Sequence, residues 1–390
     1  MALSRVMRLR FRALPHALFS AAGWRSSRAL LAAVLTLGAS GAFGALGCAG
    51  AKDAATRPPV DSGDALDAAL DDALPGADAP DDAPPDSPIT PGTSSVAVTL
   101  VVEPDDGQAK ILDAIRGATK SVHCEMYLFS DNGARDALIA AKKAGKEVQV
   151  LLEKAPYPVT NANVTDFNAL KAGGVDVRWT TGLYQLTHAK FFVVDGVTTY
   201  VMTLNFTNSG LTSNREYAAI DTDGDDVAQA EAVFAADFAG VAFKPAGGKL
   251  LLSPIDARSR LTALIDGATT TLDMEIEELT DNTVESHLNV VLSRGVVVRI
   301  VAPQTGRSAD TQATLLRLKA RGAQIKGLSS PDIHAKTVVA AGKRAYVGSI
   351  NLSSTSMDKN REVGLVTETS SVLGRLKATI DADFAKGIAL

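Results

Sequence analysis

The feature that most constrains this chain is a set of four polar residues that occurs twice, 146 residues apart. In each copy a histidine is followed by a lysine, an asparagine and a glutamate, at intervals of 2, 17 and 28 residues. The two sets are His188, Lys190, Asn205 and Glu216, and His334, Lys336, Asn351 and Glu362. Packing alone rarely keeps four different polar residue types in register, because core positions select apolar side chains. The spacing predicts one structural unit built twice.

The sequence around these residues alternates between strand-like and helix-like segments. In the first half the predicted strands are residues 121–129, 147–152 and 175–179, and the predicted helices are 134–144 and 164–172. In the second half residues 271–276, 296–301 and 322–325 repeat the strand pattern. We expect an α/β fold with two homologous α/β/α halves, each with a mixed β-sheet flanked by helices. If the halves pack about a pseudo-twofold axis, both histidines face a shared boundary.

Charge and composition divide the chain into four expected regions. The two halves are assigned to residues 97–248 and 249–390, and the segments before them to 1–48 and 49–96. Residues 97–390 carry 31 basic and 34 acidic side chains. This balance lacks the basic excess that is typical of proteins that bind nucleic acid backbones.

The N-terminal region has the pattern of an export signal. Six arginines precede an apolar stretch over residues 29–46, which ends in Ala45-Leu46-Gly47-Cys48. This ending resembles the cleavage box of bacterial lipoproteins, in which the cysteine thiol is lipidated. We expect Cys48 to anchor the protein to a bacterial membrane, at the outer membrane or the periplasmic face. Ordinary secretion and an uncleaved anchor remain as alternatives.

Residues 49–96 are rich in alanine, aspartate and proline and have almost no large apolar side chains. Such a segment cannot bury enough apolar surface to offset the entropy of folding, so we expect a disordered linker.

The repeated residues suit the cleavage of a phosphodiester. Two lysines can hold a phosphate, and two asparagine amides can donate to its oxygens as negative charge develops. We expect each histidine and lysine on one strand and the asparagine, Asn205 or Asn351, on the next strand. Each glutamate can accept the Nδ1 proton of a histidine and leave its Nε2 exposed. One neutral imidazole would attack phosphorus, and the other would protonate the leaving alkoxide. The residues do not form a metal-binding pattern, and the chemistry requires no metal or cofactor.

Both segments resemble the HxKxxxxD motif of the phospholipase D superfamily, which appears first as His188, Lys190 and Asp195. The downstream Gly-Ser-x-Asn of that family appears as Gly348-Ser349-Ile350-Asn351. The resemblance implies one metal-independent site that works through a phosphohistidine, with His188 as the nucleophile and His334 as the acid. It further implies that the phosphate is bound by Lys190, Lys336, Asn205 and Asn351. The histidines would be oriented by Glu216 and Glu362.

The sequence departs from the family pattern at two places. Met202-Thr203-Leu204-Asn205 replaces Gly-Ser-x-Asn in the first copy, and Ala341 stands where the second copy should have aspartate. We expect Asp195 to organise the turn after its strand and not to touch substrate. Each departure is then expected to cost stability or rate without removing a reacting group.

Four further acids have no assigned function. Glu125 and Glu275 occupy equivalent places in the first strands of the halves. They either face the site from its floor or pair with a lysine or arginine, and the sequence favours neither. Glu277 and Glu278 are interpreted as surface or rim residues without equivalents in the first half.

We expect a phospholipase D-type phosphodiesterase that hydrolyses glycerophospholipids to phosphatidic acid, with transfer to another alcohol as a possible second outcome. The residues alone indicate only a phosphodiester, and the resemblance supplies the lipid. The expected partners are phospholipid and a membrane surface, and the expected form is a monomer with both half-sites in one chain. The alternatives are a nuclease of the same superfamily, a cardiolipin-synthase-like transferase and a non-catalytic lipoprotein that binds anionic headgroups. The near-neutral charge disfavours the nuclease.

Overall fold

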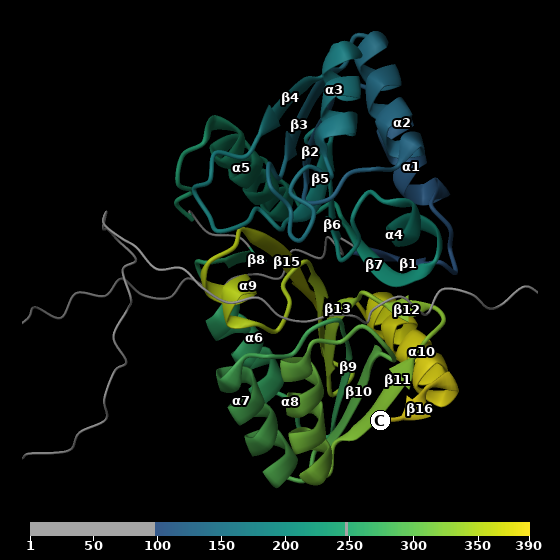
Figure 1. Ribbon diagram of the computed structural model, residues 1–390, viewed down its shortest axis with the longest axis vertical. Coiled ribbons are helices and arrows are strands. Elements are labelled where there is room, and N and C mark those ends of the chain that lie inside the picture. Colours follow the sequence, from purple (N-terminus) through teal and green to yellow (C-terminus); the bar gives the residue numbers. More distant parts are fainter. Residues whose placement is uncertain (1–97, 246–248) are drawn as a thin grey trace, which may run out of the picture. The chain divides into compact units, whose positions relative to one another are not determined.

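The computed structural model describes residues 98–245 and 249–390. These residues form two α/β halves, each with an open mixed β-sheet flanked by helices (Figure 1). This is the predicted fold class. The predicted signal segment (1–48), the predicted linker (49–96) and the lipidation site assigned to Cys48 lie outside the described residues.

The first half is built on a sheet with the strand order β1-β7-β6-β5-β2-β3-β4. Its strands are β1 (Thr99–Glu103), β2 (Ser121–Met126), β3 (Glu147–Leu152), β4 (Asp176–Trp179), β5 (Lys190–Val194), β6 (Thr198–Met202) and β7 (Asn214–Asp221). Its helices are α1 (Ala109–Arg116), α2 (Asn132–Lys143), α3 (Val164–Ala172), α4 (Asn208–Thr212) and α5 (Gly224–Ala239). Strands β2, β3 and β4 run parallel, and the others pair antiparallel.

The second half repeats this plan, with the strand order β16-β11-β10-β9-β13-β14-β15-β8. Its strands are β8 (Leu250–Ser253), β9 (Thr271–Ile276), β10 (Val297–Pro303), β11 (Gln324–Leu328), β13 (Lys336–Ala340), β14 (Arg344–Gly348), β15 (Glu362–Thr367) and β16 (Ile388–Ala389), and the two-residue β12 (Asp332–Ile333) pairs with β7. Its helices are α6 (Ala257–Asp266), α7 (Asn282–Ser293), α8 (Ala309–Ala320), α9 (Ser354–Asp358) and α10 (Ser370–Lys386).

The helix that follows the first parallel strand shows how local sequence sets an element's bounds. The Asp131 side chain accepts a hydrogen bond from the Ala134 N–H and so caps α2. Asp281 caps α7 in the same way through Val284. Near the ends of these helices Gly145 and Gly295 have φ values of 84° and 81°, which L side chains rarely adopt. The helix predicted over 134–144 therefore begins two residues earlier in the structure, directly after its N-cap Asp131.

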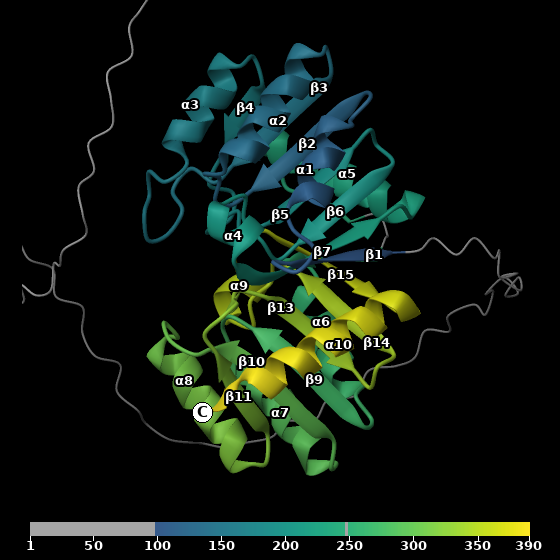
Figure 2. The same cartoon turned by 90° about the vertical axis from the view of Figure 1, so that its right-hand side faces the viewer.

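The two halves share a central core. Helices α5 and α10 lie on the opposite side of their sheets from α1–α3 and α6–α8 (Figures 1 and 2). Phe191 and Tyr217 of the first sheet belong to the same buried cluster as Val347 and Val363 of the second. Each such side chain contributes about 1.5–3 kcal/mol when fully buried. Among the helices of the described residues, none is long and apolar enough to cross a membrane.

Asp195 organises the turn between β5 and β6, at the end of β5 away from His188. Its carboxylate accepts hydrogen bonds from the backbone N–H groups of Thr119, Lys120 and Ser121, at 2.9, 2.6 and 3.0 Å. Asp195 has a φ of 56°, and Ala341 has a φ of 50° at the equivalent turn of the second half. Alanine bears this left-handed conformation less well than aspartate and offers no acceptor to the neighbouring N–H groups.

We therefore expect Ala341→Asp to raise the free energy of unfolding by about 1 kcal/mol, because it restores the missing acceptor. Urea-induced unfolding measures this change. The matched control is Ala341→Gly, which relieves the backbone conformation without supplying an acceptor. If the aspartate variant were no more stable than the glycine variant, the carboxylate would have no stabilising function at this turn.

Candidate active site

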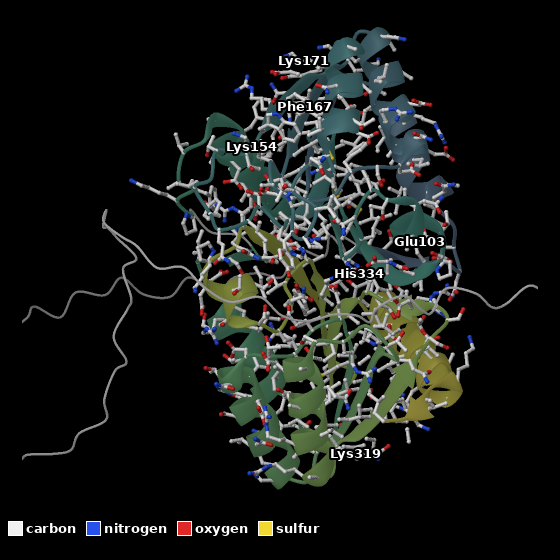
Figure 3. The ribbon with its side chains drawn as sticks, in the orientation of Figure 1. Glu103, Lys154, Phe167, Lys171, Lys319 and His334 are labelled. Atoms are coloured by element: carbon white, nitrogen blue, oxygen red, sulfur yellow. The ribbon has the colours of Figure 1, made fainter. Side chains whose placement is uncertain are left out.

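A cavity of about 750 Å³ brings together the histidines and asparagines of the two repeated sets. His188 and Asn205 of the first half line it, as do His334 and Asn351 of the second. Figure 3 shows His334 at the boundary between the two halves. A second cavity of about 300 Å³ also has His334 in its lining. Its lining includes Asn214, Thr305, Arg307, Ser308 and Asp332.

Backbone pairing between the halves places each histidine. Just before His334, β12 runs parallel to β7, with Ile333 opposite Arg215. Just before His188, Thr187 forms a parallel bridge with Arg361. The His188 N–H donates to the Arg361 carbonyl at 2.8 Å, and the His334 N–H donates to the Arg215 carbonyl at 3.3 Å. Because a glutamate follows each arginine, every histidine lies next to the glutamate of the opposite half.

The histidine and glutamate side chains pair across the boundary accordingly. The Nδ1 atom of His188 lies 2.9 Å from Oε1 of Glu362. The Nδ1 atom of His334 lies 2.6 Å from Oε1 of Glu216. Both glutamates are fully buried. With Nδ1 held by a carboxylate, the Nε2 atom of each ring is the one left for chemistry. The sequence predicted glutamate–histidine pairs but did not indicate that each pair crosses between halves.

Hydroxyl groups hold the two glutamates. Thr203 donates to Glu216 and accepts from the Tyr217 N–H at 2.9 Å. In the second half the Ser356 hydroxyl donates to Glu362, and the Ser349 hydroxyl accepts from the Val363 N–H at 3.1 Å. Thr203 therefore supplies the hydroxyl of the Gly-Ser-x-Asn pattern in the first half, and this departure from the pattern removes no polar group.

The two lysines are buried and bound to the backbone of their own histidines. Lys190 Nζ donates to the His188 carbonyl at 2.7 Å, and Lys336 Nζ donates to the His334 carbonyl at 2.6 Å. Burial lowers the pKa of Lys190 to about 7. Burial also lowers the pKa of His188 below its ordinary value of 6.5, against the opposing effect of Glu362. His188 is thus held neutral at pH 7, as a nucleophile requires.

The asparagines lie elsewhere than the sequence indicated. We expected them on the strands that follow the histidines, but β6 ends at Met202 and β14 ends at Gly348. Asn205 and Asn351 occupy the loops beyond, where Thr207 and Ser353 cap the short helices α4 and α9. The Asn205 Oδ1 atom accepts from the Leu128 N–H at 3.2 Å. The amide NH₂ of Asn205 is therefore the group available to a ligand.

The interpretation of Glu277 as a surface or rim residue was wrong. Its Oε2 atom lies 2.7 Å from Lys336 Nζ, and it lines both cavities. Its equivalent in the first half is Tyr127, because each residue directly follows the first parallel strand of its half. Glu278 also lines both cavities. The equivalence was missed because these strands are 150 residues apart, whereas the histidines are 146 apart.

Glu125 and Glu275 lie in buried networks behind the site. Arg215 pairs with Asp383 at 2.5 Å, and Arg361 pairs with Asp237 at 2.7 Å, so each ion pair joins the two halves. Burial raises the pKa of Glu275 to about 8, and the nearby Asp383 adds to this effect. Burial likewise raises the pKa of Glu125, and the nearby Asp237 adds to it. Neither acid lines the two cavities, and among the described residues neither forms an ion pair with a lysine or arginine. Glu275 instead accepts a hydrogen bond from the Tyr217 hydroxyl.

We expect a bell-shaped dependence of kcat/KM on pH. Activity should rise as His188 loses its proton below pH 6.5 and fall near pH 7 as Lys190 loses its charge. The alkaline limb of kcat should lie higher than that of kcat/KM, because a bound phosphate stabilises the ammonium form of Lys190. Steady-state rates between pH 5 and 9 test this. Lys190→Arg should remove the alkaline limb, since arginine stays charged. A flat profile from pH 5 to 8 would contradict both assignments.

Comparison with known proteins relates both halves to one family. The family described as "Cardiolipin synthase, PLD-like domain" matches residues 111–238 and 261–385. Cardiolipin synthase A of Pseudomonas aeruginosa (strain LESB58) is 32% identical over 112 residues, which are 28% of this chain and 23% of that protein. The chain therefore matches about a quarter of the length of such curated relatives.

Two solved structures share the fold at low sequence identity. Phosphatidylserine synthase of Haemophilus influenzae superimposes with a TM-score of 0.59 at 12% identity, over 75% of this chain and 87% of that one. Polyphosphate kinase of Porphyromonas gingivalis gives a TM-score of 0.57 at 14% identity, over 73% of this chain and 50% of that one.

Proposed function

Because the chain belongs to the phospholipase D superfamily and carries its PLD-like domain twice, we propose that it cleaves glycerophospholipids at the headgroup side through a phosphohistidine. Membership supports an enzyme that acts on phosphodiesters. The observation that carries the proposal is the pair of histidines at one cavity, each held by the glutamate of the opposite half.

The proposed reaction has two steps. In the first, Nε2 of neutral His188 attacks phosphorus, the bond to the leaving oxygen breaks, and His334 as imidazolium gives that oxygen its proton. In the second, neutral His334 takes a proton from water, and the resulting hydroxide displaces His188 from phosphorus. The products are a free alcohol and a phosphate monoester, and both histidines return to their starting protonation. Lys190, Lys336, Asn205 and Asn351 would bind the phosphate oxygens through both steps.

Two observations support a lipid over a nucleic acid. The relatives and one fold neighbour are named as cardiolipin synthase and phosphatidylserine synthase. Residues 97–390 also lack a basic excess, whereas binding of nucleic acid backbones depends on many basic contacts. The predicted export, the lipid anchor at Cys48 and the monomeric form remain parts of this proposal. Together they would hold the site near a membrane surface.

Transfer of the phosphatidyl group to a second alcohol is the other candidate outcome. The cavity of about 300 Å³ next to His334 is lined by polar side chains, among them Asn214, Ser308 and Asp332. This recess lies where the proton donor meets the leaving alcohol, so an acceptor alcohol could occupy it in the second step. Hydrolysis and transfer would then share one intermediate and differ only in the attacking oxygen.

Release of choline or ethanolamine from mixed phospholipid vesicles tests the proposal, with plasmid DNA assayed in parallel and glycerol added in one arm. We expect headgroup release that is lost in His188→Ala. A phosphatidylglycerol product in the glycerol arm would establish transfer. DNA cleavage without lipid turnover would replace the lipid assignment by that of a nuclease. If neither substrate is cleaved, the binding lipoprotein is favoured.

A further inference from the structure

We propose that Glu277 determines charge specificity: it occupies the place of a phosphate oxygen in the substrate-free protein and selects singly charged diesters over doubly charged monoesters. The inference rests on the proposed phosphodiester site, but it does not depend on the substrate being a lipid. Glu277 belongs neither to the repeated sets of histidine, lysine, asparagine and glutamate nor to the positions that depart from the family motif.

The contacts of one carboxylate oxygen carry the proposal. The Oε2 atom of Glu277 lies 2.7 Å from Lys336 Nζ and 3.4 Å from His334 Nε2. The Asn351 Nδ2 atom donates to the same oxygen at 3.4 Å. These three groups are the ones that the second motif would offer to a substrate phosphate. A carboxylate oxygen resembles a non-bridging phosphate oxygen in charge and in hydrogen-bond acceptance.

The position of Glu277 allows a substrate to displace it. The residue follows the end of β9, and its side chain is 35% exposed. It lines both the cavity that reaches His188 and the polar recess that includes Asn214. Burial alone would raise its pKa, but the positive charges of His334 and Lys336 hold the pKa well below its usual range. A phosphate that reaches Lys336 must therefore displace an ionised carboxylate or lie beside it.

The first half has no carboxylate at this place. Its equivalent residue is Tyr127, whose ring centroid lies 4.4 Å from that of His188 and 5.0 Å from Lys190 Nζ. An aromatic face attracts the lysine without adding a negative charge. The two halves thus share their histidine, lysine and glutamate pairs but differ in charge at the ends of β2 and β9. This asymmetry places the added negative charge on the side of the proton donor.

The charge balance explains the selectivity. In the attacking state the two lysines and one imidazolium face the carboxylates of Glu216 and Glu362, and Glu277 supplies a third negative charge. Loss of Glu277 removes one of these negative charges and favours a dianion, whether or not Lys190 is charged at the pH of the measurement. With Glu277 the additional charge of a monoester is repelled at close range, where water screens little. The site then holds the diester substrate and releases the monoester product.

Orthophosphate binding measured by calorimetry tests this proposal without turnover. At pH 8, where the dianion dominates, we expect Glu277→Gln to bind orthophosphate about tenfold more tightly than the unmodified protein, as removal of a nearby repulsive charge predicts. At pH 6, where the monoanion dominates, Glu277→Gln should increase the affinity for orthophosphate by less. In parallel, orthophosphate should inhibit hydrolysis of bis(p-nitrophenyl) phosphate at correspondingly lower concentration in Glu277→Gln.

Two comparison variants separate contact from general charge. Glu368→Gln makes the same change in net charge at a side chain that is 72% exposed and pairs with Arg344, and its phosphate affinity should not change. Glu278→Gln removes a carboxylate that accepts a hydrogen bond from Thr280. Its increase in orthophosphate affinity should be smaller than that of Glu277→Gln. Thermal unfolding checks that each variant is folded. Glu277→Ala also removes the carboxylate, and its phosphate affinity is measured beside that of Glu277→Gln.

The outcomes are distinct from those of the lipid assay. A tighter complex in Glu277→Gln at pH 8, absent in Glu368→Gln, supports the proposal even if vesicles are not cleaved. Unchanged or weaker phosphate binding in Glu277→Gln and Glu277→Ala would overturn it, as would equal gains in the Glu277 and Glu278 variants. Lipid turnover could persist in either case.

Discussion

Replacing His188 with alanine is expected to lower kcat by on the order of 10⁴-fold on every substrate, because the nucleophile itself is removed. His188 is the neutral histidine because burial lowers its pKa against the opposing effect of Glu362. Glu362 holds the Nδ1 atom, which leaves Nε2 to attack. A better leaving group cannot compensate for a missing nucleophile. His188→Ala should therefore release neither p-nitrophenolate from bis(p-nitrophenyl) phosphate nor choline from vesicles.

The matched variant His334→Ala should behave differently with the two substrates. An alkoxide such as choline needs a proton to leave, so its release should fall about as far as in His188→Ala. p-Nitrophenolate leaves without a proton, so the first step should survive and only the attack of water should slow. Equal losses of the first step in both variants would contradict the division between nucleophile and proton donor.

Replacing either glutamate should impair the histidine of the opposite half, although each glutamate lies in the same half of the sequence as the other histidine. Glu362→Gln changes the second half but should impair the nucleophile of the first, because the Glu362 carboxylate lies 2.9 Å from His188. Glu216→Gln should impair the proton donor His334, which lies 2.6 Å from Glu216. Loss of a carboxylate that orients a catalytic histidine costs about 10²–10⁴-fold in rate.

Pre-steady-state kinetics with bis(p-nitrophenyl) phosphate separates the two effects. Glu362→Gln should slow the first step and abolish any burst of p-nitrophenolate. Glu216→Gln should keep a burst of about one equivalent and then turn over slowly, because only the attack of water needs His334. Asp195→Asn, at the far end of β5, is the control and should leave the shape of the time course unchanged. The opposite assignment, with the burst in Glu362→Gln, would place each glutamate with the histidine of its own half.

Much of the fold was predictable because it depends on local and repeated signals. The strand over 147–152 and the helix over 164–172 agree with the structure at both ends. Their bounds follow from runs of apolar and β-branched residues and from glycines that end the helices. The duplication itself follows from equal spacing of unlike polar residues, which chance rarely produces.

The features that the sequence did not reveal depend on contacts between distant segments. The pairing of Glu216 with His334 follows from β12 lying beside β7, which joins residues more than 100 positions apart. The asparagines were misplaced because β6 and β14 end at Met202 and Gly348, and both asparagines lie in the loops that lead to the short helices α4 and α9. Glu277 was missed because the halves differ in length between β2 and β5, so a constant interval cannot align it with Tyr127.

The most direct test of the central claim is to find the covalent intermediate. His334→Ala is mixed with bis(p-nitrophenyl) phosphate, quenched at alkaline pH, and examined by intact-mass and peptide mass spectrometry. The account predicts one nitrophenylphosphoryl group per chain, located on His188, and none in His188→Ala. If p-nitrophenolate were released with no adduct, or if the adduct lay on another residue, a phosphohistidine at His188 would be contradicted.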